Sequence, residues 1–339
     1  MSKIDSPDPS LEEAEADRRL SADRRDIVAT LAKADNRMRH RDYRAANAFY
    51  GQVGRLAGEG VPLERSELLR ARDACVWLAE RFRLNIVEGL AAKGIAGSAM
   101  HPRFAKSLAI MFGERQRDPV FERFPQLPQM YFYPDLPYLQ FDDPARHPWT
   151  STVEGETEII LREALGLLES SGNFAPYVST DHERPQGDVH GLLDDPSWST
   201  LDLTIAGRAD PERTALSPHA FATISSSAPL CQIPSRAPSI MYSLLRAGSS
   251  IPPHTGMINT RLICHLPLII PGPGRLRVGE QVREWEVGKL LLFDDTVEHD
   301  ARNNAGQDRL VLIFDVWRPE LDLDERQQIQ ALFEVVDEG

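Results

Sequence analysis

The sequence is poor in cysteine, has no long apolar run and carries an excess of acidic residues. Its three cysteines, Cys75, Cys231 and Cys264, are widely spaced and odd in number, which excludes a disulfide framework and the paired spacing of a zinc site. No apolar run reaches the roughly 20 residues that a membrane helix needs. The polar N-terminal segment MSKIDSPDPSLEEAEADRR has no apolar signal-peptide core. We therefore expect a cytoplasmic protein without a membrane segment.

The charge balance narrows the range of partners. The chain has 51 acidic and 38 basic residues among 339, a formal net charge of −13. Nucleic acids and anionic membranes bind basic surfaces, because both carry dense negative charge. The composition therefore predicts neither as a partner, although a small basic pocket remains compatible with it.

The N-terminal third has the period of helices. Apolar residues recur at three- and four-residue steps between residues 9 and about 118, as at Ile27 and Leu31 and again at Ala46, Tyr50 and Val53. The segment DYRAANAFYGQVGRLA resembles the second half of a tetratricopeptide repeat, in one weak copy. The helices either pack as a small bundle, which the pattern favours modestly, or form a groove for a partner protein.

The rest of the chain has the period of strands. A proline-rich segment, RFPQLPQMYFYPDLPYLQFDDPARHPW, precedes a predicted helix over 155–171. Strand-like runs follow at 198–206, 239–247, 260–270, 274–287, 289–294 and 309–318, separated by turn residues, with a tight turn at Gly279. Many short strands indicate a sandwich or barrel. We expect a helical domain over 1–120 and a β domain over 121–339, which is an α+β architecture.

Two histidines stand in the apolar stretch PPHTGMINTRLICHLPLIIP, at His254 and His265. Each is either a core or turn histidine or a metal ligand, since histidine is the commonest protein ligand of metals. We expect His254 to lie where a strand begins. Cys264 and His265 are neighbours in a strand and point to opposite faces, which argues against a catalytic Cys-His pair.

Further along the chain, His299 follows the apolar run KLLLF, and Arg309 opens the strand RLVLIFDVWRP. Arg309 is either an exposed charge at a strand start or a buried one, because alternation places it on the same face as Val311 and Ile313. A buried arginine needs an anion, and its planar fork matches a carboxylate. The informative pattern is the order along the chain of His254, His299 and Arg309.

Residues from about 125 to 322 resemble the aspartyl/asparaginyl β-hydroxylase family of Fe(II)- and 2-oxoglutarate-dependent oxygenases. The segments with this resemblance are PPHTG with NTRLICHLPLIIP, then REWEVGKLLLFDDTVEH and RLVLIFDVWRPEL. The resemblance implies a double-stranded β-helix fold, of the jelly-roll or cupin-like kind. A tetratricopeptide-like helical region also precedes this domain in the family.

The resemblance also implies roles for individual residues. His254 and His299 would bind Fe(II), and Arg309 would pair with the distal carboxylate of 2-oxoglutarate. His265 and Ser243 match positions that help hold this co-substrate. Arg261 matches a position that contacts the substrate carboxylate, and Trp198 matches an aromatic residue that lines the same cleft. These last roles complete the set of site residues that the sequence predicts.

Two positions depart from expected patterns. Most iron oxygenases have a carboxylate two residues after the first histidine, and here that position is Gly256, which has no side chain to offer a metal. We expect water to fill that position, and we interpret Asp294, Asp295 and Glu298 as turn residues or as groups that orient an imidazole. Some family members have an arginine where this chain has Ile263, so 2-oxoglutarate binding would depend more on Arg309 and His265.

The resemblance thus implies a dioxygenase that uses Fe(II), 2-oxoglutarate and O2 to hydroxylate the β-carbon of an aspartyl, asparaginyl or related residue in a peptide, protein or carrier-bound substrate. One alternative is a related hydroxylase of a small molecule or lipid. The other is a non-catalytic protein with a degenerate barrel that binds a partner protein through its helical region.

Overall fold

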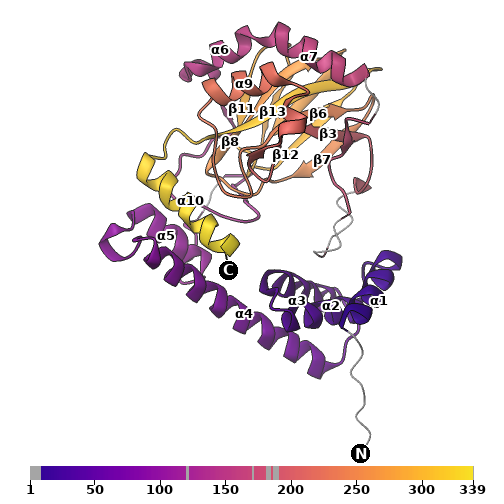
Figure 1. The fold of residues 1–339 in the computed structure, drawn as a ribbon, viewed down its shortest axis with the longest axis vertical. Coiled ribbons are helices and arrows are strands. Elements are labelled where there is room, and N and C mark those ends of the chain that lie inside the picture. Colours follow the sequence, from indigo (N-terminus) through magenta and orange to yellow (C-terminus); the bar gives the residue numbers. More distant parts are fainter. Residues whose placement is uncertain (1–8, 120–121, 170–171, 181–184, 186–190, 339) are drawn as a thin grey trace, which may run out of the picture. The chain divides into compact units, whose positions relative to one another are not determined.

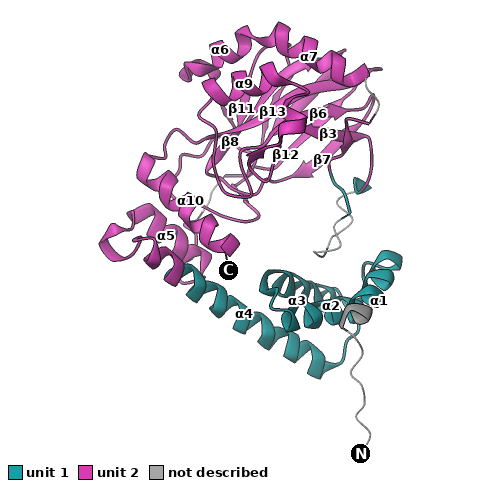
Figure 2. Ribbon diagram, in the orientation of Figure 1, with its two compact units in different colours: residues 1–87, 178–193 teal, residues 88–177, 194–339 magenta. Residues whose placement is uncertain are grey.

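The computed structural model describes residues 9–119, 122–169, 172–180, 185 and 191–338 (Figure 1). Its contacts divide the chain into two compact units, one of residues 1–87 with 178–193 and one of residues 88–177 with 194–339 (Figure 2). Each unit has its own hydrophobic core. The domain boundary predicted at residue 120 supposes that the parts on either side fold independently, and it stays a prediction.

The first unit is built from helices, as the apolar period predicts. They are α1 (Pro9–Ala22), α2 (Ile27–Arg39), α3 (Tyr43–Gly58) and most of α4 (Arg65–Ala92). Asp26 and Asp42 begin α2 and α3, because each carboxylate accepts a hydrogen bond from a backbone N–H of the first turn. The apolar faces of α2 and α3 pack together with part of α4. Within the described residues, no helix of the chain is long and apolar enough to cross a membrane.

The second unit contains two antiparallel sheets. In the described residues the larger sheet has seven strands in the order β1-β11-β8-β13-β6-β3-β2, and the smaller sheet has four in the order β10-β9-β12-β7. The strands of the larger sheet are β1 (Phe141–Asp142), β2 (Ala175–Pro176), β3 (Trp198–Asp202), β6 (Ile240–Leu245), β8 (Arg261–Ile269), β11 (Leu291–Phe293) and β13 (Arg309–Trp317). Those of the smaller sheet are β7 (Ser250–His254), β9 (Gly274–Val278), β10 (Gln281–Arg283) and β12 (His299–Asn303). A two-stranded ribbon, β4 (Thr204–Ile205) and β5 (Arg208–Ala209), lies apart from both.

Helices cover one face of the larger sheet. Helices α6 (Trp149–Gly155), α7 (Thr157–Glu169) and α9 (Pro218–Ser227) lie over this outer face (Figure 1). Their buried side chains form one core with alternate strand residues, among them Leu244, Cys264, Leu310 and Phe314. The other helical segments are η1 (Gly97–Ala99), α5 (Pro102–Met111), η2 (Pro144–Arg146), α8 (Pro211–Thr214) and α10 (Leu323–Glu338).

This arrangement is the double-stranded β-helix that the resemblance implies. The strands pass from one sheet to the other along the chain, since β6, β8, β11 and β13 belong to the larger sheet and β7, β9, β10 and β12 to the smaller one. Residues that alternate with the outer apolar set therefore lie on the inner face of the larger sheet. The fold prediction is confirmed, including the turn at Gly279, whose φ is +57°.

One local prediction was wrong. His254 ends strand β7 rather than beginning a strand, and Pro252 and Pro253 lie within that strand. Proline cannot donate a ladder hydrogen bond, so it is tolerated on an edge strand, and β7 is the edge of the smaller sheet. Residues 255–260 then lead into β8 of the larger sheet, so His254 and His265 do not belong to one strand and their spacing sets no common face.

Candidate active site

His254 and His299 are brought together across the smaller sheet. They are register partners at the ends of β7 and β12, and their ring centroids lie 4.1 Å apart. The Nδ1 atoms lie 2.8 Å from the carbonyl oxygen of Pro252 and 3.1 Å from that of Val297, so each Nδ1–H can donate to the backbone. This tautomer places the lone pair of each neutral ring on Nε2, which is the atom that binds a metal.

The environment of His299 favours the neutral ring. His299 is 8% exposed, and burial together with the neighbouring His254 lowers the pKa of His299 to about 3. Its ring meets Phe293 edge to face at 5.4 Å, and Phe293 in turn meets His265 at 5.0 Å. The chain of aromatic rings therefore links the histidine pair of the smaller sheet to His265 of the larger one.

Arg309 is buried on the inner face of the larger sheet. It is 2% exposed, and its Nη2 donates a 3.2 Å hydrogen bond to the hydroxyl oxygen of Ser243. Its guanidinium carbon lies 4.7 Å from the ring centroid of Trp285. Burial lowers the pKa of Arg309 to about 9, which leaves the group charged at neutral pH. Its Nε and Nη1 are buried without a hydrogen-bond partner in the described structure.

Ser243, Trp198 and His265 surround this guanidinium. The Ser243 oxygen also accepts from Trp198 Nε1 at 3.2 Å, so its own hydrogen is left to donate to a third group. His265 Nδ1 accepts from Trp285 Nε1 at 3.3 Å, which places the proton of the neutral ring on Nε2. Burial and the charge of Arg309 lower the pKa of His265 well below its ordinary value. The sequence reasoning missed Trp285, although the segment REWEVG contains it.

Arg261 has a different environment. It is 8% exposed, and its Nη1 and Nη2 lie 2.5 Å from Asp315 Oδ2 and 3.1 Å from Asp295 Oδ2. Burial alone would lower its pKa, but the two carboxylates raise the pKa of Arg261 above its ordinary value. The guanidinium that the sequence assigns to a substrate carboxylate thus already pairs with two carboxylates of the chain, and its substrate role stays a prediction.

Asp295 occupies the space that the missing side chain of Gly256 leaves. An ideal Cβ at Gly256 would overlap the Asp295 carboxylate, and the Gly256 N–H donates to the Asp295 carbonyl oxygen at 2.6 Å. Asp295 Oδ1 is buried without a hydrogen-bond partner in the described structure. The neighbouring Asp294 accepts from the N–H and hydroxyl of Thr296, as expected of a turn residue.

A second group of possible ligands is already occupied by protein contacts. His101, Asp322 and Glu325 have donor atoms close enough to share a metal ion. However, the carboxylates of Asp322 and Glu325 each accept a hydrogen bond from the backbone N–H of the other residue, which is a capping box at the start of α10. Glu325 also accepts a hydrogen bond from Arg103. The two carboxylates of this group therefore cap the N-terminus of α10. Of the remaining histidines, His147 and His219 pair with carboxylates, whereas His182 and His190 lie outside the described residues.

The double-stranded β-helix with a pair of histidines and a buried arginine inside it defines an oxygenase-like barrel, and sequence comparison gives its family. Residues 154–319 match the family described as "Aspartyl/Asparaginyl beta-hydroxylase". This match confirms that these residues resemble the aspartyl/asparaginyl β-hydroxylase family.

The chain is also similar to individual proteins of known name. The chain is 32% identical over 187 residues to the mouse aspartyl/asparaginyl beta-hydroxylase, a match of 54% of this chain and 25% of the relative. It is 30% identical over 182 residues to the ornithine lipid ester-linked acyl 2-hydroxylase of Rhizobium tropici, covering 52% of this chain and 60% of that one. The chain thus spans only part of the length of these relatives. A prolyl-4-hydroxylase structure from Pseudomonas putida aligns over 50% of this chain and 99% of its own at 14% identity, with a TM-score of 0.30.

Proposed function

We propose that the chain is an Fe(II)- and 2-oxoglutarate-dependent dioxygenase that hydroxylates the β-carbon of an aspartyl, asparaginyl or related residue in a peptide, protein or carrier-bound substrate. The main supporting observation is Arg309, a buried guanidinium with two nitrogen donors that meet no acceptor among the described residues. An unpaired buried charge is costly, so a site that retains one is suited to an anionic ligand.

The residues present fit both groups that this function needs. His254 and His299 would hold Fe(II), since a backbone carbonyl at Nδ1 orients each ring and leaves its Nε2 to face a metal. Arg309 would take the distal carboxylate of 2-oxoglutarate as a planar fork, assisted by the Ser243 hydroxyl and by Nε2 of His265. Bound iron would supply the oxidising chemistry, in which O2 converts 2-oxoglutarate to succinate and CO2 and one oxygen atom replaces a C–H bond of substrate by C–OH.

The chain's own residues would position and shield this chemistry. The ring centroid of Trp198 lies 6.1 Å from that of His254, and Trp198 Nε1 lies 3.2 Å from Ser243 Oγ. Trp198 would therefore form the wall between the iron site and the 2-oxoglutarate site. Ile263 is buried on the inner face between Phe293 and Asp315, and it would exclude water without adding charge. We retain Arg261 as a proposed substrate contact, and its pairs with Asp295 and Asp315 would have to rearrange or share it.

The bacterial relative favours a second candidate function. Its name describes hydroxylation of an acyl chain, and its match covers 52% of this chain, close to the 54% of the mouse protein. An acyl hydroxylase would use the same proposed iron and 2-oxoglutarate residues. Mass spectrometry of candidate peptides and acyl substrates after turnover separates the two functions. A cytoplasmic location stays part of the proposal for either one.

An anaerobic titration tests the proposal directly. Fe(II) with 2-oxoglutarate should give a weak visible charge-transfer band in the wild-type protein, and adding O2 should release succinate. His254→Ala and His299→Ala should abolish both signals, whereas His219→Ala, which alters a histidine paired with Glu156 elsewhere, should retain them. Succinate release that survives thorough chelation of iron would refute the proposal.

A further inference from the structure

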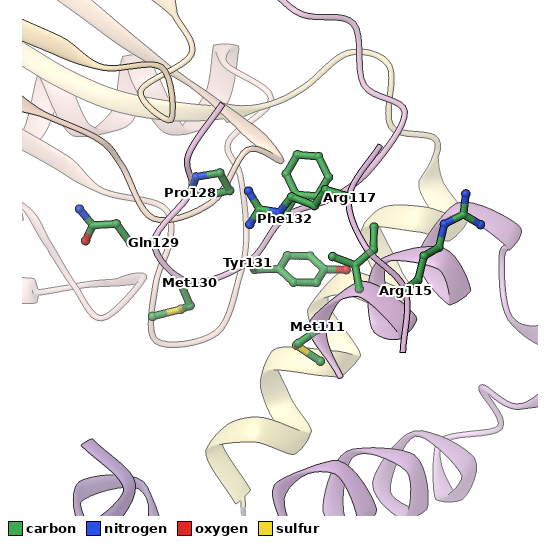
Figure 3. Close-up of a pocket in the computed structure, with 9 residues that line it drawn as sticks. Met111, Arg115, Arg117, Pro128, Gln129, Met130, Tyr131 and Phe132 are labelled. Atoms are coloured by element: carbon green, nitrogen blue, oxygen red, sulfur yellow. The ribbon is translucent and has the colours of Figure 1, made fainter. Parts of the chain in front are cut away.

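A cavity of about 350 Å³ lies in the second unit, away from the inner face of the larger sheet. Its walls come from the end of α5, the segment that follows it, and residues 128–132 (Figure 3). Met111, Met130 and Phe132 give it apolar surface, while Arg115 and Arg117 supply positive charge. None of these residues is used by the proposed iron and 2-oxoglutarate chemistry.

One wall of the cavity is joined to the loop that follows His254. Gln129 N–H donates to the Gly256 carbonyl oxygen at 3.0 Å, and Met130 N–H donates to that of Met257 at 2.9 Å. Tyr131 continues the pairing through a parallel bridge to Ile258. A bound chain that extends from the histidine pair along residues 255–258 would therefore meet the cavity wall next.

The two arginines that line the cavity differ in their partners. The Arg117 guanidinium carbon lies 4.3 Å from the centroid of the Phe132 ring, and the two side chains lie side by side in Figure 3. Within the described residues, no carboxylate lies at ion-pair distance from Arg117. Arg115 has only Asp118, at 3.6 Å, and both of these side chains are at least half exposed. In a chain of net charge −13, an arginine without a carboxylate partner is available to an incoming anion.

Apolar side chains accompany this charge. Met130 is 39% exposed and Met257 is 41% exposed, and their backbones pair. Methionine side chains are flexible and polarisable, so they accept apolar groups of varied shape. The wall toward His254 is thus apolar, and the cavity beyond it is basic.

We propose that this cavity is a subsite for an acidic segment of a peptide substrate, in which a carboxylate pairs with Arg117 and an adjacent apolar residue packs on Met130 and Met257. The assignment rests on the proposed function in taking the substrate to be a polypeptide. It adds a preference for acidic sequence beside the hydroxylated residue. Because the net charge of the chain repels an acidic peptide, such a preference has to come from a local site of this kind.

Peptide binding tests the assignment. Two fluorescein-labelled peptides of equal length share a central asparagine and flanking leucines, and one carries three glutamates where the other carries three lysines. Fluorescence anisotropy at low salt should show the glutamate peptide binding the wild-type chain at least tenfold more tightly. Arg117→Gln should remove most of this preference, and Arg117→Glu should reverse it.

Arg123 provides a matched control. It is an exposed arginine whose guanidinium carbon lies 5.3 Å from the Phe124 ring centroid, and it does not line the cavity. Arg123→Glu makes the same charge change and should preserve the preference. Tighter binding of the lysine peptide by the wild type would overturn the assignment, as would an equal loss in Arg123→Glu. Displacement of the glutamate peptide by oleate at lower concentration than by unlabelled peptide would also overturn it, in favour of an acyl occupant.

A separate measurement keeps the two proposals apart. Calorimetry with Mn(II) in place of Fe(II) reports 2-oxoglutarate binding without turnover. A chain that binds the glutamate peptide through Arg117 but does not bind 2-oxoglutarate would overturn the proposed function and support the subsite. A chain that binds 2-oxoglutarate but shows no preference for the glutamate peptide would overturn the subsite alone.

Discussion

The inner face of the larger sheet holds two buried arginines with opposite surroundings. Arg261 pairs with the carboxylates of Asp295 and Asp315, which raise its pKa, whereas Arg309 has no carboxylate partner in the described part of the chain and burial lowers its pKa. Both lie on the inner face, Arg261 at the start of β8 and Arg309 at the start of β13. Burial alone therefore does not identify an arginine that binds a ligand. The informative feature is a buried guanidinium for which the described residues supply no counter-ion.

The largest expected effect is on stability, at the paired arginine. Arg261→Met should lower the free energy of unfolding by about 3–5 kcal/mol, because it leaves two buried carboxylates without their cation. Urea denaturation of the metal-free protein measures this loss. Adding Asp295→Asn and Asp315→Asn to the same chain should restore much of it. A loss below about 1 kcal/mol would mean that the pair is not formed in solution.

Arg309→Met should have the converse effect. Its stability should change little, because the substitution removes a desolvated charge that has no carboxylate partner, but 2-oxoglutarate binding should weaken by about 2–5 kcal/mol. Calorimetry with Mn(II) measures the affinity, and urea denaturation measures the stability. Arg309→Lys should recover only part of the affinity, because lysine keeps the charge and loses the planar fork. Unchanged affinity in Arg309→Met would remove the main support for the proposed function.

The stabilisation of the folded protein by 2-oxoglutarate should also depend on Arg309. In the wild-type protein with Mn(II), 2-oxoglutarate at 100 times its Kd should raise the free energy of unfolding by about 2.7 kcal/mol. At that same concentration Arg309→Met should show less than about 1 kcal/mol of stabilisation, while Ile263→Val, a change on the inner face of β8 that removes no charge, should retain the full effect. Stabilisation of Arg309→Met equal to that of the wild type would place the anion elsewhere.

The sequence predicts the inner-face position of Arg309 better than it predicts the ion pairs of Arg261. Strand alternation puts Arg309 beside Val311 and Ile313, and the register of β13 with β6 and β8 follows that local pattern. The pairing of Arg261 with Asp295 depends instead on how a loop of one sheet packs on a strand of the other. No short-range period encodes such a contact.

Two strands of the smaller sheet, β7 and β12, are also difficult to predict from the sequence. Strand β7 contains Pro252 and Pro253, which look like a strand break, and β12 has the sequence HDARN, which lacks strand-forming residues. Both strands are specified by their pairing with each other and with β9. The proposed metal pair His254 and His299 therefore lies on two strands that the sequence did not predict, and family resemblance rather than periodicity singled out these histidines.

The last prediction, with the smallest expected effect, tests whether Gly256 makes room for the Asp295 carboxylate that pairs with Arg261. Gly256→Ala places a methyl group where the Asp295 carboxylate lies, so that carboxylate has to move and its contact with Arg261 weakens. Overpacking of this kind costs about 1–3 kcal/mol, and urea denaturation of the metal-free protein should show a loss in that range.

Gly306→Ala is the matched control for this substitution, because a Cβ at Gly306 meets no atom within 4 Å and should cost much less. The decisive measurement is the double-mutant cycle with Asp295→Ala. If the cost of Gly256→Ala arises from its overlap with the carboxylate, it should largely disappear once Asp295 is truncated, giving a coupling free energy of about 1 kcal/mol or more. Equal costs in both backgrounds would show that the absent side chain at 256 does not make room for Asp295. The charge balance around Arg261 would then not depend on the glycine that replaces the usual metal-binding carboxylate.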